Sequence, residues 1–159
     1  MMRPFRPALT AAACAVAAAG LLVPAGTARA DPGPYHRDLE ELARRLQREV
    51  REFDHVVDDN FRATPEYERL LRHTQEMQRL SRHIAEDAYD HRDVRHLRRD
   101  VERLRELEGL VRAEVDRLGR HREVDRRAFR RLQERLDDVS SALRALDREL
   151  ERRCEPHRP

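Results

Sequence analysis

Apolar residues recur every three or four positions from Tyr35 almost to the end of the chain, and charged residues fill the positions between them. This spacing indicates amphipathic α-helices, because residues three and four apart lie on the same face of a helix. No segment after residue 30 alternates apolar and polar residues as a half-buried strand would. The sequence therefore predicts an all-α fold.

Interruptions of this spacing divide the chain into helical segments joined by short connections. Thr64 followed by Pro65 is typical of a helix start, with a capping hydroxyl and a proline at the first helical position. The connection near residues 90–93 has neither Gly nor Pro and is predicted from a jump in the phase of the apolar stripe. Gly119 is expected to end the third segment as its C′ residue. We expect four helices, over about 36–61, 65–89, 93–118 and 123–153.

The last two segments repeat their apolar residues every seven positions, and in the third segment only Glu108 interrupts the series. The members of that series are Val94, Leu97, Val101, Leu104, Val111, Val115 and Leu118. Helices with this spacing pack against other helices. Short connections favour an antiparallel four-helix bundle, and a dimer of coiled-coil-like helical hairpins is the alternative. Glu108 is expected either to extend its carboxylate toward the solvent or to pair with a facing arginine, as polar core residues that fix the helix register do.

Residues 1–30 have the pattern of a cleavable export signal. Arg3 and Arg6 precede an apolar run over residues 8–23, and the small residues around position 29 offer a signal-peptidase site. The apolar run is shorter than the roughly 20 residues that a membrane span needs. We therefore expect a periplasmic or extracellular protein without a transmembrane segment after cleavage.

Removal of this signal leaves a helical bundle over residues 31–153 and a tail over residues 154–159 that is expected to be disordered. It also takes away three arginines and no acid, which changes the formal net charge from +2 to −1. Nucleic-acid binders usually carry a basic domain, so this charge argues against a nucleic-acid partner.

The two halves of the remaining chain carry opposite charge. Residues 31–90 hold 10 Arg and 15 acids, a net charge of −5, and residues 91–159 hold 20 Arg and 16 acids, a net charge of +4. This complementarity favours docking of one helical hairpin on the other within the chain, and pairing between two chains in a homodimer is the alternative.

A group of potential metal ligands lies near the end of the second helix. His83, Asp87 and His91 are spaced four residues apart and therefore share one flank of it, and His96 begins the next helix nearby. Imidazole and carboxylate groups bind Zn²⁺ and Cu²⁺. A metal site at this turn is one hypothesis, and a solvated flank away from the apolar stripe is the other.

The second candidate is at the end of the chain, where Cys154 is the one cysteine that remains after signal removal. In an oxidising compartment it would be an intermolecular disulfide or a free thiol. Cys154 and His157 together resemble the C-terminal ligand pairs of periplasmic zinc-binding helical proteins of the metal-resistance type. The resemblance covers four residues and implies a zinc site only in a dimer.

The sequence lacks the patterns of haem sites, of di-metal sites and of phosphate-binding loops. The chain has no C-x-x-C-H motif for covalent haem, and the first helix has no Met to serve as an axial ligand. Glu52-x-x-His55 occurs once, whereas a carboxylate di-metal site needs that motif on two helices. A Gly-rich phosphate loop is lacking too. We expect no enzymatic activity and no bound cofactor, apart from Zn or Cu in the metal-binding alternative.

The signal together with an Arg-rich composition without any Lys resembles the small exported helical-bundle proteins of GC-rich bacteria. This resemblance implies an all-helical exported protein and no functional residue. We therefore expect a non-enzymatic binding or structural module of the cell envelope with a protein or envelope partner. The alternatives are a metal-binding or metal-sensing protein that uses the His/Asp group, and a chaperone-like envelope protein.

Overall fold

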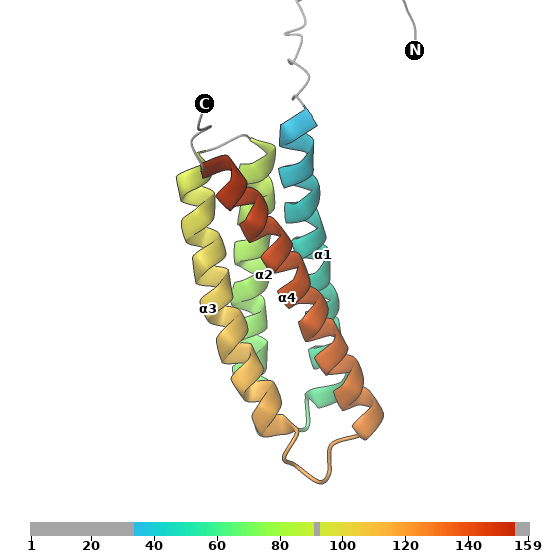
Figure 1. The fold of residues 1–159 in the computed structure, drawn as a ribbon. Coiled ribbons are helices and arrows are strands. Elements are labelled where there is room, and N and C mark those ends of the chain that lie inside the picture. Colours follow the sequence, from blue (N-terminus) through green and yellow to red (C-terminus); the bar gives the residue numbers. More distant parts are fainter. Residues whose placement is uncertain (1–33, 91–92, 155–159) are drawn as a thin grey trace, which may run out of the picture. The chain divides into compact units, whose positions relative to one another are not determined.

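The computed structural model describes residues 34–90 and 93–154 of the chain. These residues contain helices and connections but no strand, which confirms the predicted all-α class. Figure 1 shows each helix running antiparallel to the one before it, as predicted for a four-helix bundle. The helices are α1 (Pro34–Phe61), α2 (Tyr67–Tyr89), α3 (Val94–Leu118) and α4 (Arg126–Cys154).

Each helix packs against two others. α1 contacts α2 and α4, and α3 contacts the same two helices, so that the four apolar faces close around one core. The core is mostly aliphatic, with Phe53 and Phe61 of α1 and Met77 of α2 among its largest buried side chains. The predicted seven-residue series of α3 is buried except at half-buried Val94. Burying one such side chain contributes roughly 1.5–3 kcal/mol.

Two of the differences between the predicted and the observed helix ends have a local cause in hydrogen bonding. The Thr64 hydroxyl donates to the carbonyl oxygen of Phe61 at 2.7 Å, so it closes the end of α1 and does not cap α2, which begins at Tyr67. α4 begins at residue 126 and not at 123, because the Oδ1 atom of Asp125 accepts hydrogen bonds from the backbone N–H groups of residues 127 and 128. A carboxylate at this position satisfies two of the amides that a helix start leaves without partners.

Gly119 follows α3 as expected, but its backbone is not in the left-handed conformation that usually selects glycine there. Its φ of −63° and ψ of −16° are right-handed helical values that any residue adopts. A Cβ atom at this position would lie 2.6 Å from Cζ of Phe129, which is far closer than van der Waals contact. The absent side chain therefore lets the first turn of α4 approach the end of α3.

Glu108 is half-buried, and its carboxylate pairs with an arginine of its own helix and not with a facing one. Its Oε1 accepts a hydrogen bond at 2.9 Å from Arg112 of the same helix and one at 2.7 Å from the Ser140 hydroxyl of α4. Leu107 occupies the core beside it. The contact that Glu108 itself makes across the α3–α4 interface is thus with the hydroxyl of Ser140.

Among the described helices, none is long and apolar enough to cross a membrane. The expected export signal (residues 1–30), His91 and His157 lie outside the described residues, so the expectations about them stay predictions.

Candidate metal centre

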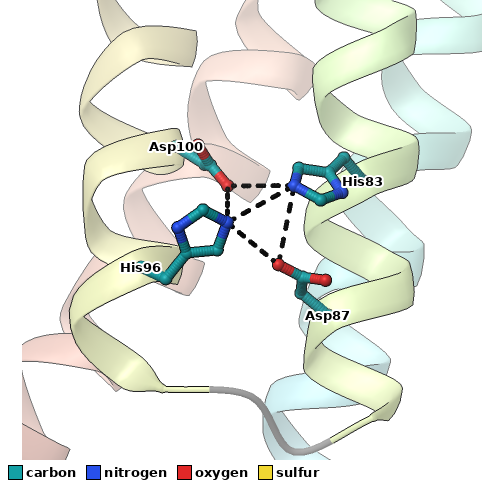
Figure 2. Close-up of side chains that lie close together, drawn as sticks. All are labelled: His83, Asp87, His96 and Asp100. Atoms are coloured by element: carbon teal, nitrogen blue, oxygen red, sulfur yellow. Dashed lines mark hydrogen bonds and ion pairs between the residues drawn. The ribbon is translucent and has the colours of Figure 1, made fainter.

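Four polar side chains converge between the end of α2 and the start of α3. His83 and Asp87 are four residues apart on α2, and His96 and Asp100 are four residues apart on α3. Residues at this spacing lie one above the other on a helix face. Since α2 and α3 are antiparallel neighbours, the two faces meet, as Figure 2 shows.

The convergence involves one atom of each side chain. The Nε2 atoms of His83 and His96 lie 3.4 Å apart. The Asp87 Oδ2 atom is 3.6 Å from the first of these nitrogens and 3.3 Å from the second, and the Asp100 Oδ2 atom is 3.7 Å and 3.4 Å from them. One ligand atom from each residue lies within 4.8 Å of the other three. The distance between the carboxylate oxygens of Asp87 and Asp100 is therefore also within 4.8 Å.

The carboxylates lie deeper than the imidazoles. The side chain of Asp87 is 3% exposed and that of Asp100 is 18% exposed, whereas those of His83 and His96 are 43% and 39% exposed. The group therefore has an acidic floor and an imidazole rim. The flank is therefore enclosed at its carboxylates and open to solvent at its imidazoles.

All four ligand atoms can offer lone pairs, and together they could hold a cation between them. A neutral imidazole whose Nε2 carries no proton offers a lone pair there, and a carboxylate oxygen offers lone pairs only. Asp100 Oδ2 is enclosed and accepts no hydrogen bond from any described residue. Buried carboxylate oxygens normally have a hydrogen-bond donor or a cation beside them. A metal ion bound by the group would place a cation beside Asp100 Oδ2.

The distances suit a small tetrahedral ion. Zn²⁺ binds imidazole nitrogen at about 2.0–2.1 Å and carboxylate oxygen at about 2.0–2.2 Å, which places neighbouring ligand atoms of a regular tetrahedron about 3.3–3.6 Å apart. Five of the six separations here lie between 3.3 and 3.7 Å. The sixth, between the carboxylates, is within 4.8 Å.

The sequence placed His83, Asp87 and His96 in one group, and the structure brings these three together. Sequence reasoning missed Asp100, although it follows His96 by the same four residues that separate His83 from Asp87. The signal for it was therefore present in the spacing. His91, the remaining predicted ligand, lies outside the described residues.

The other candidate residues stand apart from this group. Cys154 is an exposed free thiol in the last turn of α4, and its proposed partner His157 is not among the described residues. His55 is exposed on α1 and belongs to no group of three or more potential ligands in the described part of the chain.

Comparison with models of protein families, with curated proteins and with solved structures found no match to this chain.

Proposed function

We propose that this protein binds a divalent transition-metal cation, Zn²⁺ in the first place, between α2 and α3. The observation that carries the proposal is the convergence of two imidazole nitrogens and two carboxylate oxygens, one from each of His83, Asp87, His96 and Asp100. These four residues would be the ligands. This convergence supports the metal-binding hypothesis.

The donor set argues for a borderline divalent ion. Two neutral imidazoles and two carboxylates carry a charge of −2, which a divalent cation neutralises. Ca²⁺ and Mg²⁺ prefer oxygen ligands alone, and soft Cu(I) prefers sulfur. Zn²⁺ accepts mixed nitrogen and oxygen ligands in a tetrahedral arrangement, whereas Cu²⁺ prefers a tetragonal one. The separations of the four ligand atoms in the structure therefore favour Zn²⁺ over Cu²⁺.

The same ligand count supports a binding role and not a catalytic one. Catalytic zinc sites commonly use three protein ligands and leave the fourth position to water or substrate, whereas four protein ligands complete a tetrahedron. We infer from the pattern of residues 1–30 that binding takes place outside the cytoplasm. The protein would thus be an exported, non-enzymatic metal-binding module.

Thermal unfolding with and without Zn²⁺ tests the proposal. A ligand that binds only the folded state stabilises it by about 2.7 kcal/mol when its free concentration is a hundred times the Kd. We expect a rise in Tm of roughly 5–15 °C for the purified full chain. His96→Gln should abolish this rise, and His55→Gln, which removes an exposed histidine of α1, should preserve it.

Two results would contradict the proposal. One is an unchanged Tm of the full chain at saturating Zn²⁺ and Cu²⁺. The other is an equal rise in His96→Gln and in the unaltered chain, which would place the metal elsewhere. The first result would leave a structural or partner-binding helical module as the function.

A further inference from the structure

We infer that the site exchanges its cation with the solvent while the bundle stays folded, so that the protein carries or buffers labile Zn²⁺ and does not depend on the metal for its fold. The inference rests on the proposed function and adds to it how the metal is held and released. Three features of the site support it.

The first feature is access from one side. The carboxylates of Asp87 and Asp100 form the buried floor, and the rings of His83 and His96 form a rim of which about two fifths is exposed. A cation that leaves the floor therefore passes the two imidazoles and meets water directly. No helix has to move aside on the side where the rings are exposed.

The second feature is that core packing holds each ligand in place. Every ligand is followed in the sequence by a buried apolar residue: Ile84, Ala88, Leu97 and Val101. The backbone that carries each ligand is therefore fixed by the bundle core, with or without a metal. The ligands belong to regular helices and not to a loop, which keeps their spacing constant.

The third feature is the size of that core. Buried apolar side chains come from all four helices along their whole described length, and the site occupies only one end of the α2–α3 interface. Small zinc domains, in contrast, lack such a core and unfold when the metal is removed. The metal-free bundle should therefore remain folded and ready to bind again.

The test follows Zn²⁺ release and helicity together. The full chain is loaded with one equivalent of Zn²⁺ and mixed with excess chelator and a colorimetric zinc indicator, while far-UV circular dichroism is recorded. We expect complete release with unchanged helicity, at a rate at least about tenfold above global unfolding measured under the same conditions. Release at the unfolding rate, or with loss of helicity, would overturn the inference.

A core variant sharpens this test. Leu132 is buried near the start of α4, whereas the site lies where α2 ends and α3 begins, at the opposite end of the bundle. Leu132→Ala should accelerate unfolding and leave the rate of Zn²⁺ release unchanged if exchange occurs from the folded state. A parallel acceleration of both rates would contradict native-state exchange.

Val139→Ala, a smaller truncation in the α4 core, replaces Leu132→Ala if that variant does not fold. The outcomes separate the two proposals. A chain that binds no Zn²⁺ contradicts the proposed function and the inference together, whereas a chain that binds Zn²⁺ but releases it only on unfolding contradicts the inference alone.

Discussion

The Nε2 atoms of His83 and His96 lie 3.4 Å apart across the α2–α3 interface, and the two rings meet edge to face with their centroids 5.6 Å apart. The Nε2 atoms of both rings thus point into the space between the four side chains. Two neutral imidazoles direct two lone pairs or two N–H groups at each other in two of their four tautomer combinations, and share an N–H···N hydrogen bond in the other two. A metal ion accepts both lone pairs at once, which is why this relationship is central to the account.

Asp100→Asn should weaken Zn²⁺ binding without weakening the metal-free fold. An amide oxygen is a poorer ligand than a carboxylate, and even partners outside the ligand shell change metal affinity 10- to 100-fold. The variant also removes one of two carboxylates that lie within 4.8 Å of each other. We expect calorimetric affinity to fall by at least about tenfold and the metal-free Tm to stay equal or rise.

Asp116→Asn is the matched control for this change, because Asp116 is exposed on the same helix and outside the group of potential ligands. Asp116→Asn should alter neither the calorimetric Zn²⁺ affinity nor the metal-free Tm. An Asp100→Asn chain with unchanged affinity and lowered metal-free stability would mean that the carboxylate is structural.

The two glycines of the α3 region should respond to alanine in opposite directions. At Gly119 the added Cβ would lie 2.6 Å from the Phe129 ring, so the ring must shift, and we expect a loss of about 1–3 kcal/mol in the free energy of unfolding. At Gly109, inside α3, the added Cβ meets nothing within 4 Å. Alanine there should stabilise the protein by roughly 0.5–1 kcal/mol.

Urea unfolding of both alanine variants measures the difference. Stabilisation by Gly119→Ala would show that contact with Phe129 is not the reason for glycine at that position.

The buried carboxylate of Glu114 should make the fold sensitive to acid. Burial raises the pKa of this group, but hydrogen bonds from Arg117 and from Arg69 of α2 outweigh burial and leave the pKa below its ordinary value of 4.5. A carboxylate whose pKa is lower in the folded state stabilises the fold above the pKa of the unfolded chain. This contribution is lost as the pH falls below about 4.5 and through the folded-state pKa.

Glu114→Gln should therefore lower the free energy of unfolding at pH 7, by about 1–3 kcal/mol for the lost charged hydrogen bonds. The same variant should also show a smaller decline in the free energy of unfolding between pH 5 and pH 3. Glu134→Gln, an exposed change on α4, should leave both unaltered. An unchanged acid slope in Glu114→Gln would assign the acid sensitivity to other carboxylates.

The helices could be predicted from the sequence because their apolar spacing depends on each helix alone. The buried series from Leu97 to Leu118 follows directly from a period of about 3.5 residues. The hydrogen-bond partner of a capping side chain was harder to predict. The Thr64 hydroxyl can donate to a carbonyl oxygen of α1 or accept from an N–H group of α2. The backbone path between the two helices decides which of these bonds forms.

The candidate site was only partly predictable for a related reason. Within one helix the spacing of His83 and Asp87 is plain, but which residues of α3 face them depends on the rotation and offset of α3 against α2. These are set by how the two apolar faces pack. The spacing of His96 and Asp100 places them on one flank of α3, but packing between helices decides that this flank meets His83 and Asp87. The Gly119–Phe129 contact depends on such packing as well.

X-ray absorption at the zinc edge of the loaded full chain tests the central claim most directly, because it reports the atoms around the metal. We expect a first shell of four nitrogen and oxygen atoms at about 2.0–2.2 Å, with the outer-shell scattering of two imidazole rings that disappears in His83→Gln and His96→Gln combined. A shell of water-like oxygens without imidazole scattering, or a spectrum that the double variant leaves unchanged, would contradict the account.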